Sequence, residues 1–142
     1  MFRTLSDTML AAPQISPDDV ARAAAEGITL IVNNRPDDEA PGQPAGAAIQ
    51  GAAKDAGIDY LAIPVTHAGF SLPQVEAMRE AIENNKGKTL AFCRSGTRST
   101  LLWALARVHM GDDPDAVEAA ADEAGYSVAP VRSIMDAFHM AQ

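Results

Sequence analysis

The sequence predicts an α/β fold in which a mostly parallel central sheet is flanked by helices, and three observations favour it. Short apolar runs rich in β-branched residues alternate with alanine-rich amphipathic stretches, which is the pattern of β–α–β units. The connections are short and carry the Gly, Pro, Asn and Asp residues that are typical of turns. With 142 residues, of which 47% are hydrophobic, and with no repeat or linker, we expect a single domain over residues 1–142.

The first half of the chain predicts a strand pair followed by alternating helices and strands. Residues 2–5 and 8–12 are apolar and separated by a polar turn, which indicates a small antiparallel pair at the sheet edge. Ser16 and Pro17 precede two acidic residues, a typical helix start. The elements expected next are a helix over 16–26, a strand over 28–32, a helix over 45–56 and a strand over 58–63.

The second half continues the alternation and then becomes helical. Ser71 and Gln74 have the spacing of a capping box. Residues 88–92 are apolar and predict a buried strand, and the stretch behind residue 100 is apolar on most sides, as in a buried helix. The elements expected here are a helix over 71–84, the strand over 88–92, and helices over 100–108, 114–125 and 130–140.

Cys93 lies where the strand over 88–92 meets the buried helix. A strand that turns through a glycine-containing loop into a helix leaves N–H groups unpaired, and these groups attract an anion together with the helix dipole. We expect this field and the guanidinium of Arg98 to favour the thiolate of Cys93, the nucleophilic form. The alternative is a small buried apolar Cys. The expected anion-binding residues of the loop are Arg94, Ser95, Gly96, Thr97 and Ser99. The hydroxyl groups of its two serines and its threonine could equally cap the helix start.

Two other loops should reach the same edge of the sheet, because ligands of parallel α/β sheets gather at the carboxyl ends of the strands. Asn34 and Arg35 follow the strand over 28–32. Asn34 is a possible substrate contact, and Arg35 is either a second anion contact or the solvated partner of Asp37 or Glu39. His67 follows the strand over 58–63 and is a candidate acid or substrate contact, since imidazole titrates near neutrality.

Composition narrows the classes of partner. The net charge of −8 and the sequence pI of about 4.7 disfavour nucleic acids and anionic membranes. The single Cys excludes an internal disulfide and fits a reducing compartment. No apolar run has bilayer length and no basic, apolar leader is present, so we expect a soluble, cytoplasmic protein. The scattered histidines imply no metal, and no cofactor is expected. The oligomeric state stays open.

Spacing separates two families that use a Cys and an Arg around such a loop. Between Cys93 and Arg98 stand four residues, which resembles the rhodanese-type sulfurtransferases. Cysteine-dependent phosphatases have five residues there and usually a His in the place of Phe92. A loop shorter by one residue makes a tighter cradle, better sized for a persulfide sulfur than for a phosphate.

The resemblance widens over nearly the whole chain. Residues 31–36 (IVNNRP), Tyr60 with 63–65 (IPV), and the loop from Cys93 onward resemble the dual-specificity phosphatases. More closely, residues 33–37, 41–44, 93–99 and 102–105 resemble a bacterial family: the phosphatase-like domain of beta-lactamase hydrolase-like proteins, also labelled a sulfur transferase family. This resemblance implies a protein-tyrosine-phosphatase-like fold that carries a rhodanese-like loop.

The two chemistries make different demands. A phosphatase needs a general acid for its leaving group, and dual-specificity phosphatases place an Asp shortly after the stretch that resembles residues 63–65. Here the loop reads Thr66-His67-Ala68-Gly69, without a carboxylate. Sulfur transfer needs no such acid, so our leading expectation is a sulfurtransferase. It would form a Cys93 persulfide from thiosulfate or a small persulfide and pass the sulfur to a thiol acceptor.

Two alternatives remain beside this expectation. The first is a phosphatase acting on phosphotyrosine-like or small phosphate esters through a phosphocysteine. The second is a redox-sensing, anion-binding module, although the chain has no second Cys to resolve a sulfenic acid.

Overall fold

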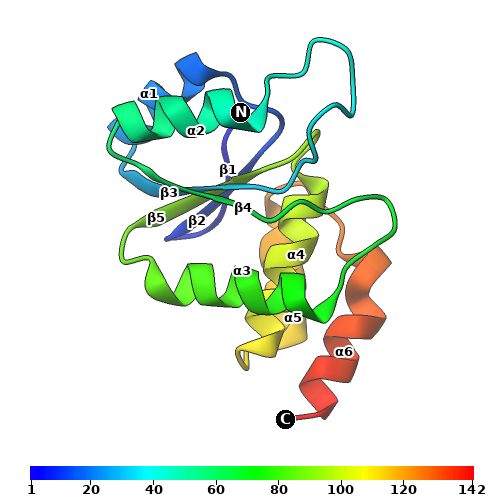
Figure 1. The fold of residues 1–142 in the computed structure, drawn as a ribbon. Coiled ribbons are helices and arrows are strands. Elements are labelled where there is room, and N and C mark those ends of the chain that lie inside the picture. Colours follow the sequence, from blue (N-terminus) through cyan, green and yellow to red (C-terminus); the bar gives the residue numbers. More distant parts are fainter.

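The structure is a computed structural model that describes residues 1–142. It contains one five-stranded sheet between two layers of helices (Figure 1), with the strand order β1-β2-β5-β3-β4. The pairs β2–β5, β5–β3 and β3–β4 are parallel, and only β1 is antiparallel to its neighbour. The strands are β1 Arg3–Ser6, β2 Met9–Ala12, β3 Ile28–Asn33, β4 Asp59–Ala62 and β5 Lys88–Phe92. The predicted α/β class with a mostly parallel sheet is confirmed.

The helices also follow the predicted alternation. They are α1 Pro17–Ala25, α2 Gly46–Asp55, α3 Leu72–Asn84, α4 Thr97–His109, α5 Pro114–Glu123 and α6 Arg132–Met140, with a 3₁₀ turn at Ala129–Val131 before α6. Ser16 and Ser71 both form complete capping boxes at the starts of α1 and α3. In each case the serine accepts from the N3 backbone N–H while the N3 side chain returns to the cap, which fixes the helix start.

Three predicted boundaries differ from the structure. The strand pair over 2–12 is not wholly at the edge, because β2 pairs with β5 and only β1 lies outside. All four residues of β2 are buried, as expected of an internal strand that has no solvated face. Helix α4 starts at Thr97, directly behind Gly96, and not at residue 100. The last helix begins with a 3₁₀ turn that contains Pro130, a residue that cannot donate a backbone hydrogen bond.

Two apolar cores hold the layers together. The smaller core packs α1 and α2 on one face of the sheet, through side chains such as Val20, Ile49 and Phe92. The larger core packs α3 to α6 on the other face, through side chains such as Met78, Leu105 and Met135. Figure 1 shows α1 and α2 above the sheet and the other helices below it. Helix α4 lies at the centre, with most of its residues buried, which explains its apolar sequence.

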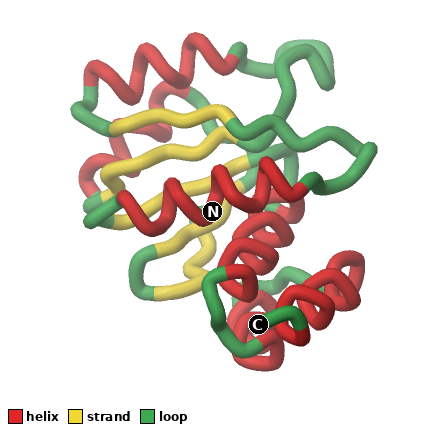
Figure 2. Tube along the Cα trace, turned by 60° about the horizontal axis from the view of Figure 1, so that its bottom comes forward, coloured by secondary structure: helices red, strands yellow, loops and turns green.

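The parallel strands end at one edge of the sheet, and their loops gather there. The loops behind β3 and β4 are long and lie at the same end of the strands (Figure 2). The loop behind β5 lies between the chain segments that leave β2 and β3, since β5 has these two strands as its neighbours. Cys93 is therefore at the middle of the edge where ligands of such sheets bind. None of the helices combines the length and apolar character that crossing a bilayer needs.

Candidate active site

Cys93 is the first residue behind β5, and its side chain is fully buried. Its backbone N–H donates to Ala12 O at 3.4 Å, which extends the pairing of β5 with the neighbouring segment. The Gly96 N–H donates to Cys93 Sγ at 3.1 Å. This contact aims a backbone donor at the sulfur, as in the loops that bind an anion at the start of a helix.

Gly96 gives the loop its shape. It has φ 92° and directly precedes α4, a conformation that costs a residue with a side chain more than it costs glycine. The backbone N–H groups of Arg94, Ser95 and Arg98 have no partner within the chain. They lie at the N-terminus of a helix of 13 residues, where the macrodipole favours an anion.

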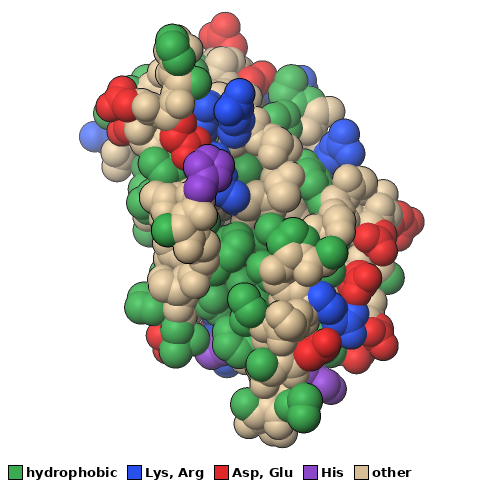
Figure 3. Space-filling model, turned by 90° about the vertical axis from the view of Figure 1, so that its right-hand side faces the viewer, with side chains coloured by type: hydrophobic (Ala, Val, Ile, Leu, Met, Phe, Trp, Pro, Cys, Tyr) green, Lys and Arg blue, Asp and Glu red, His purple; other side chains and the backbone are tan.

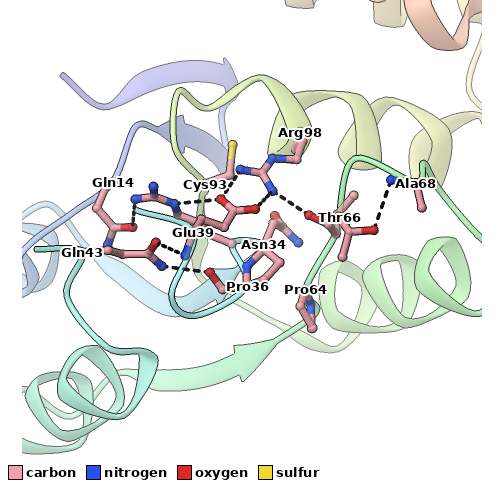
Figure 4. A network of polar contacts seen from close by, with 12 residues as sticks. Gln14, Asn34, Pro36, Glu39, Gln43, Pro64, Thr66, Ala68, Cys93 and Arg98 are labelled. Carbon is pink, nitrogen blue, oxygen red and sulfur yellow. Dashed lines mark hydrogen bonds and ion pairs between the residues drawn. The ribbon is translucent and has the colours of Figure 1, made fainter. Parts of the chain in front are cut away.

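Arg98 is held at one end of its guanidinium and free at the other (Figure 4). Its Nη1 and Nη2 donate to the two carboxylate oxygens of Glu39 at 2.7 and 2.8 Å. Its Nη1 also donates to Val65 O at 2.6 Å. These bonds use three of the five N–H donors of a guanidinium, so the edge formed by Nε–H and the second Nη2–H stays available for a planar anion.

Arg98 and Cys93 are electrostatic neighbours. The hydrogen bonds with Glu39 raise the pKa of Arg98, and the nearby Cys93 adds to that rise. Figure 4 shows the Cys93 sulfur beside the Arg98 guanidinium, on the side away from Glu39. Sequence reasoning expected both residues in the site, and the structure brings them together.

Glu39 is the functional residue that sequence reasoning treated only as a surface partner of Arg35. Its carboxylate lies between Arg98 and Arg35, and Arg35 Nε donates to Glu39 Oε1 at 2.9 Å. The hydrogen bond from Arg98 lowers the pKa of Glu39 to about 2, against the opposing effect of burial. This carboxylate is therefore ionised at neutral pH and cannot serve as a general acid.

Arg35 is buried beside Glu39 and connects it with Gln14. It is 6% exposed and donates through Nη1 to Gln14 Oε1 at 3.1 Å, besides its bond to Glu39. The Gln14 backbone N–H donates in turn to Arg94 O at 3.3 Å. The loops behind β2, β3 and β5 are thus joined through one chain of polar contacts (Figure 4).

Asn34 and Ser99 form a second brace. Ser99 Oγ donates to Asn34 Oδ1 at 2.8 Å, and Asn34 Nδ2 donates to Ile63 O at 2.9 Å. Both residues are fully buried. Their polar groups connect α4, the loop behind β3 and the segment behind β4, and thereby fix these segments relative to one another.

Of the remaining loop side chains, Ser95 and Thr97 contact each other and Arg94 extends into solvent. Ser95 Oγ donates to Thr97 Oγ1 at 3.0 Å and accepts from the Thr97 N–H at 3.4 Å, a local turn contact two residues along the chain. The N-cap of α4 is Gly96, and no side chain caps the helix. Arg94 is exposed and takes part in no side-chain hydrogen bond or ion pair. It stands at the rim of the loop, where its charge is available to an incoming anion.

His67 lies in the loop between β4 and α3, is exposed and makes no hydrogen bond. The base of this loop is tied to the site, because Val65 O accepts from Arg98, and Figure 4 shows Thr66 and Ala68 on the Arg98 side. The face that carries the loops behind β3 and β4 gathers basic side chains, an acidic side chain and a histidine (Figure 3). The stretch from Pro64 to Phe70 holds no carboxylate.

No group of three or more His, Cys, Asp or Glu side chains could hold a metal ion. The polar network of the loops consists of arginine, glutamate and amide groups around one thiol, an arrangement suited to binding an oxyanion beside a nucleophile.

The fold belongs to the class of protein-tyrosine-phosphatase-like domains. A candidate phosphatase from Neisseria meningitidis Z2491 is 32% identical, with 96% of both chains covered and a TM-score of 0.83. PTPMT1 in complex with PI(5)P is 18% identical, with 99% of this chain and 95% of that chain covered and a TM-score of 0.77. At that identity the likeness shows the fold alone. The expected fold, phosphatase-like and not rhodanese-like, is confirmed.

Within this class, the chain belongs to the family of the phosphatase-like domain of beta-lactamase hydrolase-like proteins, which matches residues 1–110. A beta-lactamase hydrolase-like protein from Xylella fastidiosa strain Temecula1 is 34% identical over 125 residues, which are 87% of this chain and 29% of that protein. One from Agrobacterium fabrum strain C58 is 35% identical over 98 residues, 69% of this chain and 22% of that protein. The chain thus spans less than a third of these relatives.

These comparisons bear on the chemistry. The family is described as a phosphatase-like domain, and the Neisseria meningitidis structure, at 32% identity, is labelled a candidate phosphatase. Sulfur transfer, our leading expectation from the loop spacing, finds no support among them, and the phosphatase alternative is favoured.

Proposed function

We propose that this chain is a cysteine-dependent phosphatase that hydrolyses phosphate monoesters through a phosphocysteine at Cys93. The observation that carries the proposal is the position of Arg98. Because Glu39 and Val65 O hold one end of its guanidinium, the free edge beside Cys93 can bind two oxygens of a phosphoryl group. A phosphoryl group held in that way lies next to the sulfur that attacks it.

In the first step, the Cys93 thiolate attacks phosphorus, the S–P bond forms and the P–O bond to the leaving group breaks. The charge on the phosphoryl oxygens is stabilised by Arg98 and by the unpaired N–H groups of the loop. Before the attack, the Gly96 N–H stabilises the thiolate. Arg94, at the rim, attracts the substrate anion.

The leaving oxygen needs a proton when its alcohol is a weak acid. The ionised Glu39 cannot supply this proton, and His67 is the one titratable side chain in the 64–70 loop. We assign His67 as the proton donor. An exposed acid without a hydrogen-bond partner acts weakly, so the proposed enzyme prefers aryl phosphates, whose phenoxides leave with little assistance.

In the second step, water attacks the phosphorus of the phosphocysteine and the S–P bond breaks. Inorganic phosphate leaves and the Cys93 thiolate is restored. His67, deprotonated after the first step, takes the proton of the attacking water, as microscopic reversibility requires.

Sulfur transfer is the second candidate, because of the four-residue spacing and the absence of a carboxylate in the 64–70 loop. Here the Cys93 thiolate attacks the outer sulfur of thiosulfate, the S–S bond breaks and sulfite leaves with the electron pair. A thiol acceptor then takes the outer sulfur from the Cys93 persulfide.

Parallel assays with para-nitrophenyl phosphate and with thiosulfate plus cyanide separate the two candidates. We expect phosphate release that is lost in Cys93→Ser, and no thiocyanate above the level of that variant. Thiocyanate formation that depends on Cys93, without phosphate release, would replace the phosphatase by the sulfurtransferase.

A further inference from the structure

Tyr126 lies behind the nucleophile loop and contacts it at two points. Its hydroxyl donates to Ser95 O at 3.3 Å. A Cβ added to Gly96 would lie 2.2 Å from the same hydroxyl oxygen, so the hydroxyl packs directly against the glycine backbone. The residue lies in the turn between α5 and the 3₁₀ turn, outside the residues that match the family.

The carbonyl that Tyr126 contacts belongs to the peptide whose N–H donates to the Cys93 sulfur. Ser95 O and Gly96 N are parts of one trans peptide, whose C=O and N–H point in opposite directions. The Gly96 N–H of this peptide is the group that donates to Cys93 Sγ. A hydrogen bond on the carbonyl side therefore fixes the direction of the N–H on the sulfur side.

This orientation is not guaranteed by the backbone alone. Gly96 has no Cβ, so the peptide in front of it can rotate at low cost. In the rotated peptide the Ser95 carbonyl would face Cys93 Sγ, and its negative end would oppose a thiolate or a bound oxyanion. A group that favours one orientation thus controls whether the loop can bind an anion.

We propose that Tyr126 is a positioning residue for the nucleophile loop, whose hydroxyl holds the Ser95–Gly96 peptide with its N–H toward Cys93. Both phosphate and sulfur transfer begin with the thiolate, so this role extends beyond either proposed reaction.

The surroundings hold Tyr126 in place for this role. Its ring lies 5.4 Å from the Arg3 guanidinium, and Arg3 Nη1 donates to Ala124 O at 2.9 Å. The Tyr126 N–H donates to Ala121 O at 2.9 Å. Burial raises the pKa of Tyr126, with Arg3 opposing and the Cys93 charge adding to the rise. The hydroxyl therefore remains protonated and can donate at neutral pH.

The substitution Tyr126→Phe removes the hydroxyl and keeps the ring. Since the chain has a single Cys, the rate of alkylation by iodoacetamide as a function of pH reports on Cys93 alone. We expect the midpoint of this profile to move to higher pH, and kcat with para-nitrophenyl phosphate to fall about two- to tenfold, the factor of one net hydrogen bond.

The matched control is Tyr60→Phe, the same change at the only other tyrosine. Tyr60 OH accepts from Asn33 Nδ2 at 3.0 Å and does not contact the nucleophile loop. This variant should keep the profile of the wild type. An unchanged profile in Tyr126→Phe, with a lowered Tm only, would reduce Tyr126 to a packing residue and overturn the proposal.

A second measurement needs no variant and can overturn the proposal even if Tyr126→Phe fails to fold. In the wild-type protein the Gly96 amide should exchange its hydrogen more slowly than the Ser95 amide, which has no partner. Equal exchange at the two amides would mean that the peptide is not held, and would overturn the proposal.

Discussion

At the scale of single residues, Glu39 determines what Arg98 can do. A guanidinium beside a thiolate would otherwise pair with the sulfur or move between partners, since its side chain has several rotatable bonds. The two hydrogen bonds from Arg98 to Glu39 and the third to Val65 O remove this freedom. The cost of ordering the side chain is then met during folding and not when the substrate binds.

The substitution Glu39→Gln tests this role. We expect kcat/KM with para-nitrophenyl phosphate to fall on the order of tenfold to a hundredfold, because a displaced Arg98 no longer presents two donors to the phosphoryl group. The matched control is Glu83→Gln, which removes the acid of the exposed Arg79–Glu83 pair and should keep full activity. A Glu39→Gln enzyme with wild-type kcat/KM would contradict the assignment.

The same carboxylate predicts a pH dependence of stability. The pKa of Glu39 falls from 4.5 to about 2 in the folded protein, so the ionised group stabilises the fold above pH 4.5. This stabilisation is lost as the pH falls from 4.5 toward 2. The difference in Tm between the wild type and Glu39→Gln should therefore be large at pH 7 and shrink in acid. A difference that stays constant across this range would show that the ion pairs do not contribute.

His67 predicts a dependence on the leaving group. In His67→Ala, we expect hydrolysis of an alkyl phosphate to fall about a hundredfold, the low end of the range for a general acid, because His67 is exposed. Hydrolysis of para-nitrophenyl phosphate should change much less, because its phenoxide leaves without a proton. Steady-state rates on both esters check this, and equal losses on the two would assign His67 to anion binding and not to proton transfer.

At the scale of elements, the sequence predicted which segments form helices and strands because their signals are local. Ser16 with its following acids and Ser71 with Gln74 carry the capping pattern in four consecutive residues. The central position of β5 could not be read in this way. Strand order depends on pairing between segments far apart in the chain, and all buried strands have similar apolar sequences.

In the candidate site, too, only the residues that belong to a local sequence motif could be predicted. Cys93 and Arg98 lie in one short motif between a strand and a helix, and so could be found from the sequence. Glu39 is separated from Arg98 by 59 residues and lies in an irregular loop, where no periodic pattern indicates the direction of a side chain. Tyr126 is similar, since the packing of α5 against α4, α6 and β1 brings a residue 30 positions away behind Gly96.

The cap of α3 connects stability with the site. In Ser71→Ala, loss of the capping box should destabilise the protein by about 1 kcal/mol. Because Gln74, the partner of Ser71, also donates to Pro64 O, the loop that carries His67 should loosen and alkyl phosphate hydrolysis should decrease. Ser16→Ala removes the same kind of box from α1 and should lower Tm alone. If both variants hydrolysed the alkyl phosphate at the same rate, the α3 cap would have no influence on the site.

At the scale of the whole molecule, the fold places one thiol at the meeting point of four loops and fixes those loops to one another. Every buried side-chain nitrogen and oxygen atom has a hydrogen-bond partner, so the network behind the site is complete before any ligand binds. The net charge of −8 repels anions at long range. The exposed Arg94 and the free edge of Arg98 are therefore the local features to which the proposed function assigns attraction of a phosphate ester.

The central claim is that a phosphoryl group is transferred to Cys93. The most direct measurement is the intact mass of the protein after rapid acid quench during turnover of para-nitrophenyl phosphate, with Cys93→Ser treated in parallel. We predict a phosphoryl adduct that maps to Cys93 and is absent from the variant. Phosphate release from the wild type without an adduct on Cys93, or no phosphate release together with a gain of sulfur at Cys93 from thiosulfate, would contradict the account.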